Sequence, residues 1–430
     1  MLERFFQLRE HGTTVRTEIL AGVTTFLTMS YIIFVNPEIL SSTGMDKSAV
    51  FVATCLAAAI GTLIMSLVAN WPIGMAPGMG LNAFFAFTVV GSLGYSWQQA
   101  LGAVFISGII FVLITVTGVR SWLIQGIPRS LRSAIAAGIG LFLAIIALGN
   151  AGIVVAHPAT KVALGDLTAP PALLALLGFF IIAALDALKV RGAILIGILA
   201  VTVLSMLTGQ SGFNGIFSAP PSLAPTFFQL DIMGALHTGF VHVILVLVLV
   251  EVFDATGTMI GVASRAGLIE PGKPNRLGRA LLADSSAIVA GSFLGTSSTT
   301  AYVESASGVQ AGGRTGLTAL TVAVLFLLSL FLAPLAGSVP AYATAPALLY
   351  VAGLMLREIT QIDWDDMTEA TPAALTAIVM PFTYSIANGL AFGFISYVVL
   401  KAVTGRFRDI HAATLLVAVL FIIKYGFFPE

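Results

Sequence analysis

The sequence predicts an all-α polytopic membrane protein with about 14 transmembrane segments arranged as two inverted repeats of seven. Three observations lead to this fold class: the composition, the spacing of apolar stretches and an internal repeat. Of the 430 residues, 58% are hydrophobic and 9% are charged, whereas about 25% are charged in a typical soluble domain. The mean hydropathy of +1.01 excludes a water-soluble core with a polar shell. A transmembrane barrel would show short alternating strands in place of continuous apolar runs.

Apolar stretches recur along the whole chain at the length of a bilayer-crossing helix, which takes about 20 residues. The stretches 81–93 and 304–311 are too short to cross as regular helices, so we expect broken segments there. The predicted windows, in order, are 18–40, 48–69, 81–93, 99–118, 134–151, 171–188, 192–208, 238–262, 281–294, 304–311, 316–336, 341–356, 371–387, 389–403 and 411–428.

The positive residues predict the orientation. With a cytoplasmic N-terminus, the clusters follow spans four, six, eight, ten and fourteen, and all face the cytoplasm as the positive-inside rule requires. They are Arg120–Arg132, Lys189–Arg191, Arg265–Arg279, Arg314 and Lys401–Arg408. Residues 1–16 carry both charge signs and no cleavable signal, which indicates a surface helix. With zero net charge and no basic tract, nucleic-acid binding has no support. The single cysteine, Cys55, excludes an internal disulfide framework.

The chain repeats itself at a distance of about 200 residues. Residues 170–182 and 192–209 resemble 371–384 and 389–405 in their prolines, in the small residue that opens the second span and in a closing Thr-Gly. Because seven spans is an odd number, the second copy starts on the opposite side of the membrane. Such inverted repeats are typical of secondary transporters that alternate access around a central site. The window 411–428 has no counterpart and is either a spanning or an interfacial extra helix.

Two acids lie inside an apolar helix, where a carboxylate costs about 3 kcal/mol on insertion scales. Glu251 and Asp254 follow the run HVILVLVLV at a spacing of three, which puts them on one helix face together with Thr258. Two carboxyls so close in a low dielectric favour holding at least one proton, which suits proton coupling. The alternative is a pair of packing acids satisfied by serines or threonines.

The third and tenth spans look like extended stretches that lead into half-helices at mid-membrane. Asn82 lies in PIGMAPGMGLNAFFAF and Glu304 in GTSSTTAYVESASG. The N–H groups at the half-helix starts would face a polar ligand. The alternatives are a helix cap for Asn82 and a dipole-compensating helix-terminal acid for Glu304. Asp284 opens span nine near Arg279, so a structural ion pair between them is its alternative.

With these residues located, the chain resembles the nucleobase:cation symporter-2 family, in its AzgA-like branch of adenine, hypoxanthine and guanine permeases. The resemblance runs nearly end to end. The strings that carry it are REHGTTVRTEILAGVTTFLTMSYIIFVNP, APGMGLNAFFAF, VFDATGTMIGVASRAGL, LLADSSAIVAGSFLGTSSTTAYVESASGVQAGGRTGL and MPFTYSIANGLAFGF.

The resemblance implies a core, a gate and short antiparallel strands in spans three and ten. Purine would bind at the core–gate boundary and enter with a proton by alternating access, in a protein that is usually a homodimer. The expected divisions are a cytoplasmic surface helix (1–16), core (17–120), gate (121–210), core (235–337), gate (338–405) and a C-terminal hydrophobic segment (406–430). The expected location is the bacterial inner membrane, with a cytoplasmic N-terminus.

The resemblance places the family's membrane acids on Glu251, Asp254, Asp284 and Glu304, and its span-three asparagine on Asn82. Expected binding residues are Glu251, Asp254, Glu304, Asn82, Val303, Tyr302, Phe84 and Thr28, and expected proton-coupling residues are Asp254, Glu251 and Asp284. Phe85 and Phe382 are further candidates to stack on a base. No cofactor or metal is expected: His157, His237, His242 and His411 lack metal-ligand spacing.

Other functions stay open to test. An anion carrier of the same architecture should have a neutral or cationic site at span ten, and a uracil or xanthine carrier would differ in substrate only. An intramembrane aspartyl protease would need a Gly-x-Gly-Asp string, which the sequence lacks. A channel would conduct without saturation. No nucleotide-binding Gly-rich loop supports ATP-driven transport. A transporter and not an enzyme is therefore predicted.

Overall fold

The computed structural model describes residues 2–236, 241–269 and 276–427, and side chains there except those of Ser121, Val241, His242, Phe253 and Phe427. His237 and residues 270–275 of the predicted Arg265–Arg279 cluster lie outside the described residues. In the first half the elements are α1 (Leu2–Phe6), α2 (Val15–Met29), α3 (Ile32–Ser41), α4 (Lys47–Ile64), η1 (Met65–Ala69), β1 (Met75–Pro77), α5 (Met79–Ala83), η2 (Phe84–Ser92), α6 (Trp97–Val116), α7 (Val119–Gly126), α8 (Arg129–Asn150), β2 (Val154–His157), β3 (Lys161–Leu164), α9 (Pro170–Ala187), α10 (Ala193–Leu207) and α11 (Ile232–Ala235).

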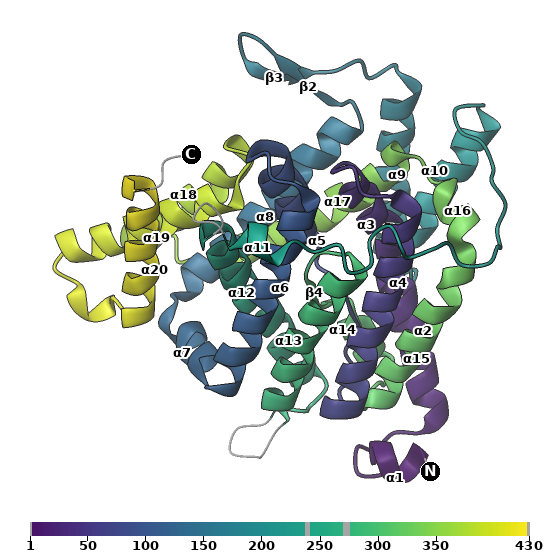
Figure 1. Cartoon of the computed structure of the whole chain (residues 1–430), viewed down its shortest axis with the longest axis horizontal. Coiled ribbons are helices and arrows are strands. Elements are labelled where there is room, and N and C mark those ends of the chain that lie inside the picture. The colour runs from purple at the N-terminus through teal and green to yellow at the C-terminus, as the bar shows by residue number, and fades with distance from the viewer. Residues whose placement is uncertain (1, 237–240, 270–275, 428–430) are drawn as a thin grey trace.

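The second half repeats this order of long helices and one central strand (Figure 1). Its elements are α12 (Val241–Arg265), α13 (Leu277–Leu294), β4 (Thr299–Ala301), α14 (Ser305–Gln310), α15 (Gly316–Ser329), η4 (Leu330–Leu332), α16 (Ala333–Gly337), α17 (Ala341–Leu356), η5 (Arg357–Gln361), α18 (Met367–Phe382), α19 (Ile386–Val403), η6 (Phe407–Asp409) and α20 (Ala412–Phe427). Every predicted apolar window contains a helix. Among the described residues, nine helices are long and apolar enough to cross a membrane by themselves.

Local sequence signals set several helix starts. Asp46 caps α4 by accepting a hydrogen bond from the Ala49 N–H at 2.7 Å. Ser96 and Gln99 form a reciprocal capping box at the start of α6. Pro170 opens α9, where its missing N–H costs nothing. These polar residues lie just outside apolar runs, so each run begins as a helix at a defined residue.

The two central strands cross antiparallel in the buried middle of the molecule. Met75 pairs with Ala301, Ala76 with Thr300 and Pro77 with Thr299. The Gly78 N–H donates to the Ser298 carbonyl at 2.9 Å, and the Tyr302 N–H donates to the Gly74 carbonyl at 3.0 Å. Extended backbone inside a membrane must find partners within the protein, and here each broken span supplies them for the other. The predicted strands of spans three and ten are confirmed.

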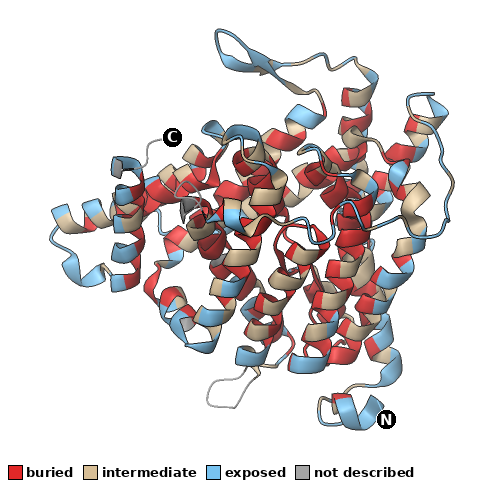
Figure 2. Ribbon diagram, viewed as in Figure 1, coloured by how far each residue is buried: buried red, intermediate tan, exposed pale blue. Residues whose placement is uncertain are grey.

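The long helices pack in two groups. In the first group, α15 packs on α2 and α4, and α13 packs on α4 and α6; in the second, α8 packs on α17, α18 and α19, and α9 and α10 pack on each other and on α17. Buried residues concentrate where these helices meet, whereas the outer helix faces are more exposed (Figure 2). Those exposed faces carry large apolar side chains such as Leu113, Phe180 and Leu207, which is typical of helices that face lipid and not water.

Two features lie outside the repeat. The hairpin β2–β3 projects at the opposite end of the molecule from α1 (Figure 1), and the sequence reasoning did not predict it. Helix α20 packs on α19 and α7, and the Thr414 hydroxyl donates to the Gly126 carbonyl at 2.6 Å. With 16 residues, α20 is shorter than the roughly 20 that cross a bilayer.

Candidate functional site

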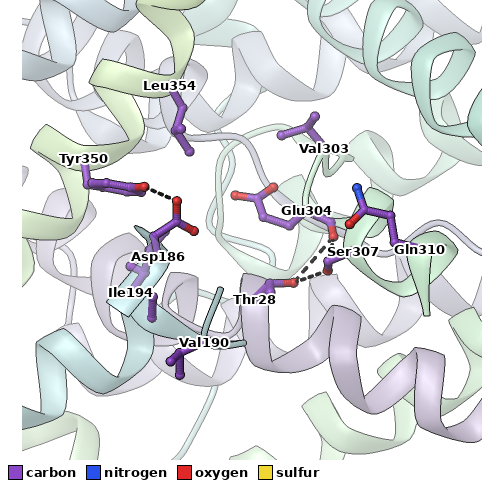
Figure 3. A pocket seen from close by; sticks show the side chains of 12 residues that line it. Thr28, Asp186, Val190, Ile194, Val303, Glu304, Ser307, Gln310, Tyr350 and Leu354 are labelled. Atoms are coloured by element: carbon purple, nitrogen blue, oxygen red, sulfur yellow. Dashed lines mark hydrogen bonds between the residues drawn. The ribbon is translucent and has the colours of Figure 1, made fainter. Parts of the chain in front are cut away.

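A cavity of about 250 Å³ lies between the tenth span and the second group of helices. Its walls come from α2, from the segment that leads into α14, from the turn between α9 and α10, and from α17. The polar or central residues of its lining include Thr28, Asp186, Val303, Glu304, Gln310 and Tyr350. Helices distant in sequence therefore contribute polar groups to one space (Figure 3).

Glu304 is the acid that reaches into this cavity (Figure 3). It is the residue before α14, and one carboxyl oxygen, Oε1, accepts a hydrogen bond from the Tyr31 hydroxyl at 2.6 Å. The Glu304 carbonyl accepts from the Ser307 hydroxyl at 2.6 Å, and Thr28 Oγ1 lies 2.9 Å from Ser307 Oγ. These contacts fix the backbone at the break and leave part of the carboxyl facing the cavity.

Opposite Glu304, the cavity wall carries a second acid. Asp186, at the end of α9, accepts a hydrogen bond from the Tyr350 hydroxyl of α17 at 2.6 Å (Figure 3). The sequence reasoning missed both residues, and it also missed Tyr31. The available signal was an acid and a tyrosine within otherwise apolar windows, FFIIAALDAL and ALLYVAGLML.

The structure brings three predicted binding residues to the cavity wall and keeps five away from it. Thr28, Val303 and Glu304 line the cavity. Glu251, Asp254, Asn82, Tyr302 and Phe84 do not line it, so their contact with a ligand stays a prediction. Phe85 is buried, and Phe382 is 82% exposed, outside the cavity lining.

Asn82 and Tyr302 instead hold the strand crossing together. Asn82 is wholly buried, and its Oδ1 accepts a hydrogen bond from the Ser297 hydroxyl. In the part of the chain that the structure describes, its Nδ2 has no hydrogen-bond partner. The Tyr302 hydroxyl donates to the Pro77 carbonyl at 2.6 Å. Both contacts join the third span to the tenth.

The two acids of α12 have different surroundings. Glu251 is wholly buried. Its Oε1 lies 3.4 Å from the Ser107 hydroxyl of α6, and its Oε2 has no hydrogen-bond partner among the described residues. Asp254 is partly buried and lies within electrostatic range of Asp284 and Glu304. No hydrogen bond joins Glu251 to Asp254. Their predicted sharing of one proton therefore stays a prediction.

Asp284 forms a buried ion pair, but with a different arginine from the one predicted. Asp284 Oδ2 lies 3.2 Å from an Arg120 guanidinium nitrogen, and the two side chains are 0% and 1% exposed. Arg279, the predicted partner, is exposed. The sequence reasoning placed Arg120 with the cytoplasmic charges. Its distance from Arg129, the next basic residue, was the signal that it stands apart.

Of the four histidines considered as metal ligands, the structure describes the side chains of His157 and His411, and these two lie in different elements. His157 is in the β2–β3 hairpin, where its Nδ1 accepts from the Ala159 and Thr160 N–H groups at 3.3 Å. His411 lies beside Trp122, with ring centroids 5.7 Å apart and ring planes tilted by 53°. Within the described ranges, no group of three or more histidine, cysteine or acidic side chains is placed to hold a metal ion.

A protein-family model described as "Permease family" matches residues 16–423. The chain is 53% identical to adenine permease AdeP of Escherichia coli over 99% of this chain and 96% of that protein. It is 45% identical to guanine/hypoxanthine permease PbuO of Bacillus subtilis, covering 97% and 99% respectively.

The solved transmembrane domain of the cyanobacterial bicarbonate transporter BicA matches this structure with a TM-score of 0.66 at 17% sequence identity, covering 87% of this chain and 97% of that one. SLC26A9 matches with a TM-score of 0.65 at 12% identity, covering 91% and 66%. These likenesses show the seven-plus-seven inverted-repeat fold.

Proposed function

The chain belongs to the nucleobase:cation symporter-2 permease family, whose members are transporters and not enzymes, and from this premise we propose that it takes up purine bases with protons. The single observation that carries the proposal is the Glu304 carboxyl, held by Tyr31 and facing a small cavity. At about 250 Å³, that cavity is smaller than the pockets of drug-sized ligands, as a single base requires.

The chemistry at Glu304 suits the edge of a base. A carboxylate accepts hydrogen bonds from ring or amino N–H groups. The N–H of Val303 has no acceptor within the described part of the chain, so it is available to a ring nitrogen or a carbonyl. Adjacent acceptor and donor groups match the alternating donors and acceptors of a purine edge. The names of the relatives, adenine permease and guanine/hypoxanthine permease, support the same substrate class.

An anion is a poorer fit to this cavity. Two acids, Asp186 and Glu304, line it, and both would repel an anionic solute. The solved transporters named for bicarbonate and anions share only the fold with this chain, at 17% identity or less. The remaining alternative is a carrier of uracil or xanthine with the same architecture.

Glu251 and Asp254 are the proposed proton carriers. Glu251 Oε2 is buried without a partner, and an ionised carboxylate in that position would be very costly. A protonated carboxyl gains an O–H donor and loses its charge. Uptake should therefore fall at alkaline pH and collapse when a protonophore removes the gradient.

We assign the two helix groups to a core and a gate that move relative to each other. The cavity is lined by the α9–α10 turn, which includes Val190 and Gly192 and carries Lys189 and Arg191. By the positive-inside rule this turn is cytoplasmic, so the cavity lies on the inward side. The proposal includes a bacterial inner-membrane location, a cytoplasmic N-terminus and a homodimer, as the family resemblance implies.

The direct test is radiolabelled uptake in cells that lack their own nucleobase permeases. Adenine, hypoxanthine and guanine should compete with one another, and uracil and xanthine should not. If uracil competes as well as adenine does, the purine assignment is wrong.

Coupling is tested in the same cells. Asp254→Asn removes a titratable group and should abolish accumulation against a gradient. Normal accumulation by this variant, at parental expression, would remove Asp254 from the mechanism.

A further inference from the structure

Arg120 is a cation buried among the acids of the membrane interior. Its Nε donates to the Thr256 hydroxyl at 3.1 Å, and one terminal nitrogen donates to the Leu281 carbonyl at 3.2 Å. The other donates to Asp284 at 3.2 Å. The guanidinium carbon lies 4.1 Å from the centre of the Phe111 ring. Every guanidinium nitrogen therefore has an acceptor, and an arginine in a protein does not lose its proton.

The Asp284 carboxyl has hydrogen-bond donors that stabilise its ionised form. In addition to the contact with Arg120, Asp284 Oδ1 accepts a hydrogen bond from the Thr300 hydroxyl at 3.3 Å. The Ala301 N–H also stabilises the ionised carboxyl. Both of these partners belong to strand β4. The pair thus ties α7, which carries Arg120, to the strand crossing that leads to Glu304.

The charges around the pair do not balance. The charged groups that face it are Glu251 and Asp254 on α12, whereas α6 contributes the neutral Thr115 and Phe111 and β4 contributes Thr300. In the described part of the chain, Arg120 is the one cation among these acids. It compensates a single carboxylate, and its geometry assigns it to Asp284. The carboxyls of Glu251 and Asp254 then have no cation to balance them and must be neutralised by protons.

We infer that Asp284 remains ionised as the counterion of Arg120 and is a positioning residue for β4, so that the transported proton is carried on α12 and not on Asp284. This inference rests on the proposed proton-coupled uptake. It departs from the expectation, taken from the family resemblance, that Asp284 takes part in proton coupling.

The test is a double-mutant cycle on the full-length protein in proteoliposomes. The variants are Arg120→Gln, Asp284→Asn and the combination of both, with Glu251→Gln as the matched control. Each is assayed for thermal stability, for radiolabelled adenine and hypoxanthine uptake, and for the pH profile of that uptake.

Each single variant leaves one buried charge without its partner and should lower both thermal stability and uptake, the latter by about tenfold or more. The double variant removes both charges. It should recover stability and most of the uptake, with the pH profile of the parent. Glu251→Gln should flatten that profile.

Two results would overturn the inference. One is a double variant as unstable as the two single changes combined, since the pair would then not be a coupled unit. The other is a stable double variant whose uptake has lost its pH dependence, since Asp284 would then carry the proton. If the double variant fails to fold, Asp284→Asn alone decides: its residual uptake should keep the parental pH dependence, and uptake that no longer depends on pH would overturn the inference.

A failure of the proposed function would look different. In that case the parent itself would show no proton-driven purine uptake, whereas the stability cycle would still report whether Arg120 and Asp284 form a coupled pair.

Discussion

The third and tenth spans occupy equivalent positions in the two repeats, yet they do different things in the structure. Each has a three-residue strand followed by a helix, and the strands pair with each other. In the third span, α5 and η2 form a continuous apolar helix from Met79 to Ser92. The polar residue of this span, Asn82, is buried in the protein interior. In the tenth span, α14 has six residues, and its polar residue Glu304 faces the cavity.

This difference shows how an inverted repeat becomes functionally asymmetric without changing its topology. Asn82 and Glu304 lie in corresponding segments. The Asn82 amide is buried and accepts a hydrogen bond from Ser297, whereas Glu304 lines the cavity and accepts a hydrogen bond from the buried Tyr31. The third span therefore supports the crossing, and the tenth span carries the carboxyl that lines the cavity.

The largest expected effect follows from removing the cavity acid. Glu304→Ala should abolish purine binding while the protein still folds, because the side chain faces a cavity and not a packed core. Glu304→Gln keeps the shape but replaces an acceptor with a donor, and should weaken binding roughly 10- to 100-fold. Calorimetry on purified protein measures both. Parental affinity in both variants would reduce Glu304 to a helix-terminal acid.

A glycine in each segment tests how closely the half-helices are packed. A methyl group at Gly308 would meet Thr25 Oγ1 and, at 2.7 Å, the Ala21 carbonyl of α2. Backbone cannot give way, so Gly308→Ala should push α14 off α2 and cost about 1–3 kcal/mol of stability, with a loss of purine affinity. Thermal shift and binding titration would show both.

Gly80→Ala is the matched control in the third span. Its methyl would meet Cγ2 of Ile139 at 2.7 Å, and its three nearest contacts are all with that side chain and not with backbone. We expect a smaller loss of stability and unchanged affinity. Equal effects at Gly80 and Gly308 would contradict the proposed asymmetry.

Removing the buried amide of the third span should affect stability more than binding. Asn82→Ala leaves the Ser297 hydroxyl without its acceptor, at a cost of about 1–3 kcal/mol. Affinity should stay close to the parent. The readout is thermal unfolding alongside purine titration. A loss of affinity as large as that of Glu304→Gln would mean that both spans contact the base, as the family resemblance implies.

The smallest of the expected losses of purine affinity is at the residue that orients Glu304. Tyr31→Phe removes the 2.6 Å hydrogen bond to the carboxyl and keeps the ring. We expect about a threefold to tenfold loss of affinity, measured by titration. Tyr302→Phe is the control, since its hydroxyl donates to the Pro77 carbonyl and should change affinity less.

The sequence by itself determined the membrane class, the helix positions, the inverted repeat and the broken third and tenth spans. These features depend on local hydrophobicity and on breaks made by proline, glycine and serine. It also identified Glu304 as a polar group where no packing role explains one, because an acid in an apolar span is costly wherever the chain folds.

Only the tertiary structure decided which side chains meet. The Arg120–Asp284 pair joins residues 164 positions apart, and the Asp186–Tyr350 contact joins residues that are also 164 apart. Charge counting along the chain placed Arg120 with the cytoplasmic cations, since nothing local tells a buried cation from an exposed one. A cation is stable inside the membrane only where it pairs with an anion from another helix. Helix packing alone determines where such an anion lies.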